Sequence, residues 1–219
     1  MSFTDSFLLQ KLANKSISKE DLLKIVEADF SKVPELFVGV SSKKAAVRYS
    51  CASLLVSLSS RHPQQLYPYM DRFIALLNSK YRILTWNAIA AIANLCCIDK
   101  DKKFDAIFDK YFGNLNSGYL VTAANVVGNS GKIAVAKPYL IPKITCELLK
   151  VENIAITPHL TQECKRVLAE LAVKTFNMFY DKMGFEEKGK VHVFVKRQLD
   201  SPRKRLKAEA ETFLKKWNA

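Results

Sequence analysis

Few residues of this sequence have the types and spacings that perform catalysis or hold a metal ion. The three histidines, His62, His159 and His192, are far apart, and none has a second histidine three or four residues away, as a helical metal site needs. The segment 128–132, Gly-Asn-Ser-Gly-Lys, lacks the glycine spacing and the final Ser or Thr of a phosphate-binding loop. A Gly-x-Ser-x-Gly nucleophile motif is absent. The sequence therefore predicts no catalytic residue, no metal site and no cofactor, and the protein is not expected to be an enzyme.

The cysteines favour structural thiols over redox chemistry. Their number is odd, they form no Cys-x-x-Cys motif, and each lies in an apolar, helix-like context: Cys51, Cys96, Cys97, Cys146 and Cys164. Buried free thiols of an intracellular protein explain this pattern. The alternative is a redox switch formed by the adjacent pair, Cys96 and Cys97.

Basic residues gather in short polar segments and suggest a site for polyanions. The chain has 34 Lys and Arg against 21 Asp and Glu, a formal charge of +13. The residues concerned are Lys43, Lys44, Lys80, Arg82, Arg203, Lys204, Arg205 and Lys207. Phosphates bind well where positive charge meets a helix N-terminus. No aromatic residues are seen to interleave with these cations, so a solvated edge is the competing interpretation.

The composition predicts a helical protein that is soluble and intracellular, with a cytoplasmic location expected. Hydrophobic residues make up 49% of the chain, which is enough for a sizeable core. Only seven glycines and seven prolines occur, few for an all-β protein. No apolar run approaches the ~18–20 residues that span a bilayer, and the N-terminus lacks the features of a secretion signal.

An internal repeat supplies the elements that position these residues. With Ser42 placed over Ser79, the apolar positions Val47, Cys51, Leu54, Leu55 and Leu58 fall on Leu84, Ala88, Ala91, Ile92 and Leu95, a spacing of 84 − 47 = 37 residues. The offsets 0, 4, 7, 8 and 11 describe one face of a helix. The same template fits Leu160, Cys164, Val167, Leu168 and Leu171, and again Leu206, Ala210, Phe213, Leu214 and Trp217. Leu55 and Ile92 are expected to be almost fully buried.

A middle copy is expected from residues 116–119, Asn-Ser-Gly-Tyr, which echo Asn-Ser-Lys-Tyr at 78–81. Its second helix fits worst, because Asn129 and Ser130 fall on apolar positions of the template. Each second helix should follow a first helix, at residues 22–37, 67–77, 104–115, 139–149 and 191–199. Serine or aspartate in the intervening turns should cap the second helix. Residues 183–189 are predicted to be a polar loop, and residues 151–158 a second insertion.

These helix pairs resemble the HEAT and armadillo-like superfamily, in which an apolar–basic pair opens the second helix. Val47-Arg48 matches that opening, Leu206-Lys207 matches it loosely, and Leu84-Thr85 lacks the basic residue. The resemblance implies an all-α fold, a right-handed α-α superhelix of about five helix pairs in one domain. The pairs are expected at 20–60, 67–97, 104–133, 139–178 and 190–219, with residues 1–19 as an N-terminal cap. Pairs of this size stack into one core because none buries its apolar face alone.

The resemblance also places the second helices on the inner, concave face, where a partner would bind. Residues outside the core template there are Tyr49, Trp86, Asn87 and Asn125; the two rings fall at equivalent positions of successive repeats, and the two amides form a short ladder. Such a surface suits a peptide or a protein helix, although both rings could instead pack against the neighbouring repeat. The leading hypothesis is a non-catalytic scaffold that binds a protein partner. The alternatives are a nucleic-acid-binding solenoid that uses the basic edge and, with Trp86, an enzyme similar to the solenoid DNA glycosylases for alkylated bases.

Overall fold

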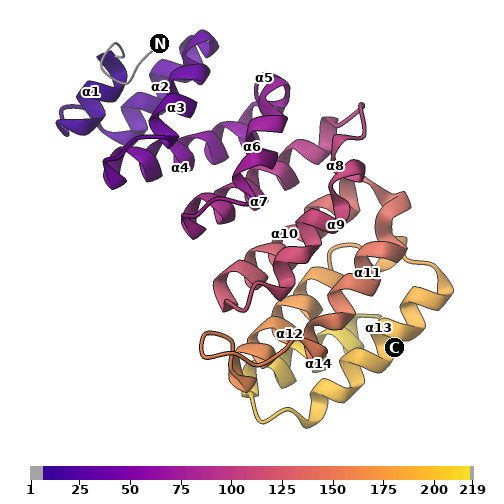
Figure 1. Cartoon of the computed structure of the whole chain (residues 1–219). Coiled ribbons are helices and arrows are strands. Elements are labelled where there is room, and N and C mark those ends of the chain that lie inside the picture. Colours follow the sequence, from indigo (N-terminus) through magenta and orange to yellow (C-terminus); the bar gives the residue numbers. More distant parts are fainter. Residues whose placement is uncertain (1–6, 218–219) are drawn as a thin grey trace. The chain divides into compact units, whose positions relative to one another are not determined.

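The computed structural model describes residues 7–217, which form an all-α fold in two compact units, Met1–Ala106 and Ile107–Ala219. No strand occurs among the described residues; a single isolated bridge joins Thr157 to Leu160. In each unit the long second helices pack side by side, α4 with α7 in the first, and α10 with α12 and α12 with α14 in the second (Figure 1). Residues 1–6 of the predicted N-terminal cap lie outside the described residues, and α1 follows them. None of the described helices combines the length and the apolar character needed to cross a bilayer.

The first unit contains eight α-helices among its described residues. They are α1 (Phe7–Ala13), α2 (Lys19–Ala28), α3 (Val33–Val40), α4 (Ala45–Arg61), α5 (Pro63–Leu66), α6 (Met70–Leu76), α7 (Arg82–Leu95) and α8 (Lys103–Ala106). Short 3-10 turns at Phe30–Lys32, Tyr67–Tyr69 and Cys96–Ile98 join several of them. The long helices α4 and α7 are the second helices predicted from the repeat.

The predicted first helices are broken in two in this unit. The helix expected at 22–37 ends at Asp29, whose extended backbone separates α2 from α3, and the Asp29 carboxylate accepts the N–H of Ser31 at 3.1 Å. The next first helix is divided by the turn Tyr67–Tyr69, which contains Pro68. These two repeats therefore consist of two short helices and one long helix, an arrangement that armadillo-type repeats can have.

The second unit contains six α-helices among its described residues. They are α9 (Phe108–Phe112), α10 (Leu120–Ala136), α11 (Ile141–Leu149), α12 (Gln162–Phe176), α13 (Phe185–Arg197) and α14 (Lys204–Trp217). Turns of 3-10 helix lie at Gly113–Asn116, Pro138–Leu140, Lys150–Asn153, Tyr180–Lys182 and Gln198–Asp200. An insertion was predicted at 151–158. The structure has the end of a 3-10 turn at 151–153 and then a loop at 154–161, which carries the Thr157–Leu160 bridge.

The polar loop predicted at 183–189 is wrong, because α13 already begins at Phe185. Glu186 and Glu187 lie in its first turn, where a carboxylate stabilises the positive end of the helix. Glu186 also accepts a hydrogen bond from Lys190 one turn later, at 2.6 Å. The polar residues that suggested a loop therefore stabilise the start of a helix.

The predicted core positions are confirmed in α4 and α7, where every residue of the template is buried. Leu55 is 1% and Ile92 0% exposed. The register predicted for the fourth copy is wrong, although Leu168 is buried as predicted. Leu160 is buried in the loop before α12, whereas Cys164, Val167 and Leu171 are only half-buried. The buried side of α12 comprises Leu168, Ala169, Ala172, Val173, Thr175 and Phe176.

The second helix of the third copy is a regular α-helix despite its weak sequence match. Its second helix, α10, runs for 17 residues, and Tyr119 precedes it just as Tyr81 precedes α7. Ser130 takes the place of an apolar residue and is fully buried, but its hydroxyl donates to the Val126 carbonyl at 2.6 Å. Because the hydroxyl is hydrogen-bonded, the burial of this polar side chain is not costly.

Serines order the turns before four of the second helices, although not as predicted. The hydroxyl oxygen accepts the backbone N–H two residues later, at 3.1 to 3.4 Å, in Ser42, Ser79, Ser117 and Ser201. The cap positions of α4, α7 and α10 are instead Lys44, Tyr81 and Tyr119, which make no side-chain cap bond. Serine therefore fixes the turn and not the first helical N–H groups.

Candidate functional site

The outward side of α4 and α7 in the first unit carries three of the predicted partner-binding residues. We define the α4–α7 face as the accessible residues Tyr49 and Ser53 of α4 with Trp86, Asn87 and Ala90 of α7. Ser53 is exposed and the other four are half-buried. The spacings of three or four residues place them on one side of each helix. Neither helix contains Asp or Glu, and their accessible charges are confined to the ends, Arg61 and Arg82. The face is thus uncharged.

The Tyr49 ring belongs to a stack of aromatic and basic side chains. The guanidinium carbon of Arg48 lies 3.8 Å from the centre of the Tyr81 ring and 4.7 Å from that of Tyr49. Lys80 Nζ lies 5.2 Å from the centre of the Tyr81 ring. We call Arg48, Tyr49, Lys80 and Tyr81 the edge cluster. The expectation that aromatic residues do not interleave with the basic turns is wrong here, because Tyr81 separates two cations.

Arg48 is the basic residue of the apolar–basic pair that opens α4, and it is buried. It is 5% exposed, and its Nη1 donates to the Ser42 carbonyl at 2.8 Å while Nη2 donates to the Tyr49 hydroxyl at 3.3 Å. Its Nε has no hydrogen-bond partner. In the second repeat Thr85 replaces it, and its hydroxyl reaches the Leu76 carbonyl at 3.5 Å. This position therefore ties the second helix to the end of the first.

The two predicted amides bond to their own helices. Asn87 Nδ2 donates to the Ile83 carbonyl at 2.7 Å, and Asn125 Nδ2 donates to the Val121 carbonyl at 2.8 Å. Each side chain is half-buried, and its amide oxygen accepts none of the hydrogen bonds described here. Asn87 belongs to the first unit and Asn125 to the second, so each is described in its own surroundings.

The basic residues predicted in the first unit are exposed at the turns. Lys43, Lys44, Lys80 and Arg82 all lie just before or at the start of a second helix. Lys43 and Lys44 line a hollow of about 430 Å³ together with Val38, Ser41 and Ser42. The edge cluster and these lysines bring predicted partner-binding and polyanion-binding residues to neighbouring positions.

In the second unit, Arg203 is neutralised by two carboxylates. Its Nη1 lies 2.7 Å from Glu163 and its Nε 2.9 Å from Glu170. Burial opposes ionisation of Glu170, but hydrogen bonds from Lys174 and Arg203 hold its pKa below the ordinary value. Lys204, Arg205 and Lys207 are exposed. Arg205 lines a hollow of about 330 Å³ that also contains Glu170 and Glu209. Of the predicted cations of this unit, Arg203 and Arg205 therefore lie close to carboxylates.

The loop 154–161 covers the turn before α10, and the sequence did not predict this contact. The N–H of Leu120, the first residue of α10, donates to the His159 carbonyl at 3.2 Å. The Thr157 hydroxyl donates to the Gly118 carbonyl at 2.6 Å, and the His159 ring stacks on Tyr119 with centroids 4.8 Å apart. Gly118 has a φ of +78°, which favours glycine. This turn has neither basic residues nor a free helix N-terminus to offer to phosphates.

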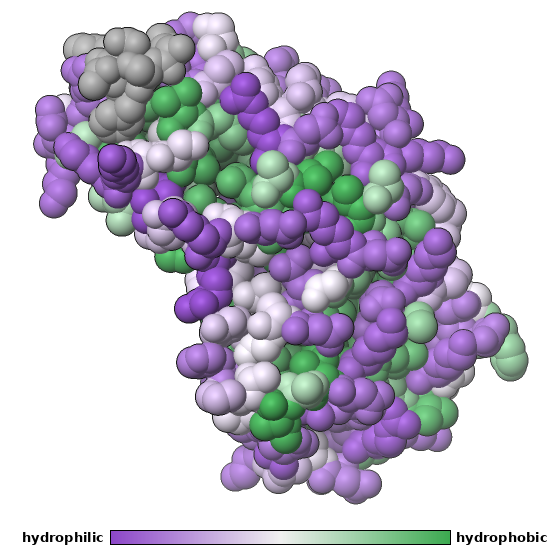
Figure 2. All heavy atoms as spheres, in the orientation of Figure 1, coloured by the Kyte–Doolittle hydropathy of each residue, from purple (hydrophilic) through white to green (hydrophobic). Residues whose placement is uncertain are grey.

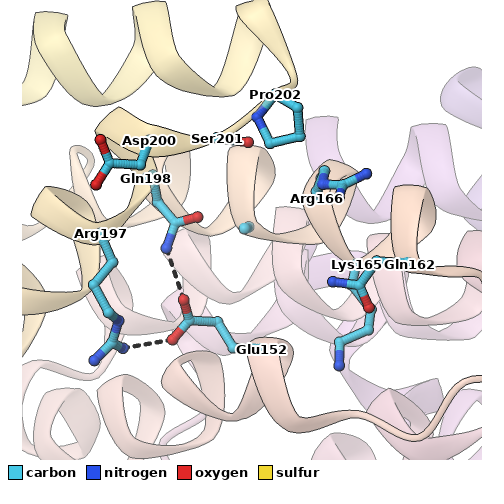
Figure 3. Close-up of a pocket in the computed structure, with 10 residues that line it drawn as sticks. Glu152, Gln162, Lys165, Arg166, Arg197, Gln198, Asp200, Ser201 and Pro202 are labelled. Atoms are coloured by element: carbon cyan, nitrogen blue, oxygen red, sulfur yellow. Dashed lines mark hydrogen bonds and ion pairs between the residues drawn. The ribbon is translucent and has the colours of Figure 1, made fainter.

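A hollow of about 200 Å³ lies between α12 and the turn that precedes α14 (Figure 3). On one side Glu152 accepts hydrogen bonds from Arg197 and from Gln198, the latter at 2.7 Å. On the other side α12 contributes Lys165 and Arg166. The lining mixes charges of both signs. This arrangement can bind a polar side chain.

Two of the five cysteines are buried, and His62 has a structural role. Cys51 and Cys96 are buried as predicted, and burial raises the pKa of the Cys51 thiol to about 12. Cys97 and Cys146 are exposed and Cys164 is half-buried, so the expectation of five buried thiols is wrong for these three. His62 lies 3.1 Å from Glu27 and contacts the Phe30 ring edge-on, which is a structural role.

Solved structures with a similar fold include two engineered proteins. Comparison of the sequence with family models and with curated proteins finds no match. A designed armadillo repeat protein superposes with a TM-score of 0.55 at 15% identity, over 89% of this chain and 85% of that chain. The crystal structure of an engineered protein gives a TM-score of 0.55 at 18% identity, over 97% of this chain and 92% of that one. At these identities the likeness concerns the fold alone.

Proposed function

Starting from an armadillo/HEAT-like helical repeat fold, we propose that this chain is a non-catalytic scaffold that binds a segment of a partner protein along the α4–α7 face. The observation that carries the proposal is the make-up of that face. Two aromatic side chains, Tyr49 and Trp86, stand at equivalent positions of neighbouring repeats, and no accessible charge lies between the helix ends. Aromatic residues on an uncharged patch are typical of the centre of protein interfaces.

The small residues of the face favour a segment that approaches closely. Ser53 and Ala90 occupy equivalent positions one turn beyond the two rings. Their short side chains leave room between the rings and the following turn of each helix. The amide oxygen of Asn87 is available to accept a backbone N–H, since its nitrogen already donates within the helix.

The surroundings of the face favour an acidic partner. Lys43, Lys44, Lys80 and Arg82 stand at the turns that lead into the two helices, and neither helix adds a carboxylate. Acidic residues at one end of the bound segment would meet these cations. Charge complementarity of this kind increases the association rate and selects between partners.

An enzymatic role for Trp86 has less support. The solenoid DNA glycosylases use a carboxylate together with aromatic residues on the same face. Neither α4 nor α7 contains Asp or Glu, so these two helices supply no such carboxylate.

The proposal is tested with peptides selected from a random displayed library and then titrated against matched variants. Ala90→Glu places a charged side chain on the α4–α7 face, whereas Ala75→Glu makes the same change at an exposed position of α6. We expect Ala90→Glu to weaken the binding of the selected peptides at least tenfold, about 1.4 kcal/mol, and Ala75→Glu to leave it unchanged. Circular dichroism checks that both variants remain folded.

Two outcomes would contradict the proposal. Equal affinities of the two variants would place peptide binding elsewhere on the chain. Binding of a short DNA duplex at near-physiological salt, lost in Lys80→Glu and unaffected by Ala90→Glu, would instead favour a nucleic-acid-binding edge. The edge cluster is the observation that supports this second candidate, because it combines aromatic rings with cations. Phosphate-driven binding must weaken steeply as the salt concentration rises.

A further inference from the structure

The first unit has an excess of positive charge that its own carboxylates do not balance. Residues 36–98 contain seven Lys or Arg and a single acidic residue, Asp71. That carboxylate pairs with Lys103 at 2.7 Å, so it is already neutralised. Hydrophilic side chains cover most of the surface in view in Figure 2, and hydrophilic character alone therefore marks no site. The sign of the charge is more informative, because this stretch of the chain is almost without carboxylates.

The unpaired cations of this stretch gather at the turns before α4 and α7. Lys43, Lys44 and Lys80 are exposed, and none of them has an ion pair among the described residues. We call these three residues the turn lysines. Arg61, at the other end of α4, pairs with Glu27 at 3.2 Å. The charge of the turn lysines is therefore not balanced within the described part of the chain.

A buried guanidinium joins the two turns and adds fixed positive charge to them. Arg48 is 5% exposed, and its Nη1 donates to the carbonyls of Ser42, at 2.8 Å, and Lys43, at 3.4 Å. Its guanidinium lies against the Tyr81 ring, and Lys80 Nζ lies 5.2 Å from the centre of that same ring. No carboxylate of the described residues pairs with Arg48, although burial of a charge is costly unless the charge is paired. A bound anion would supply the negative charge that this arrangement lacks.

The start of α4 strengthens the attraction for an anion. Its N-cap, Lys44, makes no side-chain cap bond, so no side chain accepts from the first N–H groups of this 17-residue helix. The residues at that start, Ala45 and Ala46, are exposed. The hollow of about 430 Å³ that Lys43 and Lys44 line lies at the same turn. Free N–H groups at a helix start attract anions, and here two lysines stand beside them.

We propose that the partner segment bound along the α4–α7 face carries a phosphorylated residue at one end, and that its phosphoryl group binds at the turn lysines. This inference rests on the proposed function, since the face has to hold the rest of the segment. A phosphoryl group carries a charge of about −1.5 to −2 at neutral pH and three acceptor oxygens. The turn lysines donate to these oxygens, while Arg48 is buried and contributes through its charge. Tyr49 belongs both to the face and to the edge cluster, so the two parts of the ligand lie next to each other.

A nucleic acid fits this arrangement less well than a phosphorylated protein segment does. Its phosphates carry charge along the whole strand and require cations along the whole path. In α4 and α7 the accessible charges are confined to the helix ends, so the α4–α7 face offers cations only at its edge. A single carboxylate also fits less well, because its one negative charge leaves most of the charge of the turn lysines unbalanced. One concentrated negative charge next to apolar side chains matches a phosphorylated residue.

The test uses immobilised pools of short random peptides that differ only in one fixed residue, which is phosphoserine, serine or glutamate. Binding of the full chain to each pool is titrated by biolayer interferometry at near-physiological salt. We expect the apparent affinity for the phosphoserine pool to exceed that for the serine pool at least tenfold, about 1.4 kcal/mol. The affinity for the glutamate pool should lie between the two, because a carboxylate carries less charge.

Matched variants locate the phosphoryl group on the chain. Lys80→Glu removes one of the turn lysines, and Lys100→Glu makes the same change of net charge at an exposed position beyond the other end of α7. General attraction to a chain of charge +13 depends on the net charge, so it changes equally in both variants. We expect Lys80→Glu to reduce the preference for phosphoserine severalfold and Lys100→Glu to retain it. Circular dichroism checks that both variants remain folded.

Three outcomes would overturn the inference. They are equal binding of the phosphoserine and serine pools, binding of the glutamate pool as tight as that of the phosphoserine pool, and equal behaviour of Lys80→Glu and Lys100→Glu. If the first outcome is accompanied by binding of a short DNA duplex that is lost in Lys80→Glu, the edge belongs to a nucleic acid.

Failure of this inference is distinguishable from failure of the proposed function. If the inference alone fails, peptides selected without phosphate still bind, and Ala90→Glu weakens their binding. If the proposed function fails, Ala90→Glu leaves the affinity for all three pools unchanged, and the inference fails with it.

Discussion

At the scale of single residues, Asp99 shows how one carboxylate organises a joint between repeats. It is 7% exposed, and its oxygens accept the N–H groups of Lys103 and Phe104, each at 2.9 Å. It also accepts the Tyr67 hydroxyl at 2.7 Å, which links the turn after α7 to the turn before α6. A buried carboxylate with three donors is therefore a cap for α8 and a tie between two repeats.

Removing this carboxylate should destabilise the first unit. We expect Asp99→Ala to lower the free energy of unfolding by about 1–3 kcal/mol, since it leaves two buried N–H groups and a hydroxyl without their acceptor. Urea denaturation measures the change. Asp101→Ala is the control, because Asp101 is exposed and accepts the Tyr67 hydroxyl at the longer distance of 3.1 Å. Equal losses of unfolding free energy in both variants would show that the hydrogen bonds of Asp99 stabilise the first unit no more than those of Asp101.

At the scale of elements, the periodicity of apolar residues predicted the second helices well where the core face was continuous. All five template positions of α4 and of α7 are buried, so the register of both helices followed from the sequence. The break at Asp29 was not predicted, because apolar residues continue on both sides of it. The register of α12 failed since Leu160 is buried in a loop and gave the same signal as a helical core residue.

The periodicity of apolar residues also predicted part of the candidate site. Periodicity identifies which residues leave the core, and it selected Tyr49, Trp86, Asn87 and Asn125 as accessible positions, each of which is half-buried. It carries no information on side-chain partners. The hydrogen bonds of Asn87 and Asn125 within their own helices, and the stacking of Arg48 on Tyr81, depend on contacts that local sequence spacing does not encode. The first part of α13 was missed because residues 183–189 were interpreted as a polar loop, whereas the rest of this helix was expected at 191–199.

The central position of the template gives a test of packing at this scale. Ile92 is fully buried in the middle of α7, so Ile92→Ala removes three carbon atoms from a dense core. We expect the free energy of unfolding to fall by about 2–5 kcal/mol, as for other large-to-small core changes. Ile83→Ala, at a position 36% exposed in the same helix, should cost less than half as much. A smaller effect at Ile92 than at Ile83 would mean that the register of α7 is wrong.

At the scale of the whole molecule, the excess of positive charge makes stability depend on the ionised carboxylates. The formal charge is +13 at neutral pH, and every carboxylate that gains a proton raises it. Several carboxylates are held ionised by partners. Hydrogen bonds from Lys32 and Ser31 lower the pKa of Asp29 to about 2, and those from Arg203 and Arg166 lower the pKa of Glu163. When these carboxylates are protonated in acid, their attraction to the basic partners is lost. At the same time the repulsion among the positive charges of the chain grows.

This dependence predicts a loss of stability in acid. A carboxylate whose pKa is lower in the folded state stabilises the fold above its ordinary pKa, and this contribution disappears as the pH falls below that value. For Glu170 the ordinary value is 4.5 and the folded value is lower. We therefore expect the free energy of unfolding, from urea titrations, to fall between about pH 5 and pH 3, and to fall less in Glu170→Gln. Glu211→Gln, at an exposed position of α14, should retain the dependence of the unchanged protein.

The loop that covers the turn before α10 limits how far this chain can be treated as interchangeable modules. In most repeat arrays each copy contacts only its neighbours through side chains, so one copy can be deleted or duplicated by splicing at the turns. Here the backbone carbonyl of His159, which belongs to the fourth copy, accepts the N–H of Leu120 in the third, and Thr157 bonds to Gly118. Excising the fourth copy alone would leave those backbone groups without partners. In recombination or design, the third and fourth copies therefore have to be kept together as one unit.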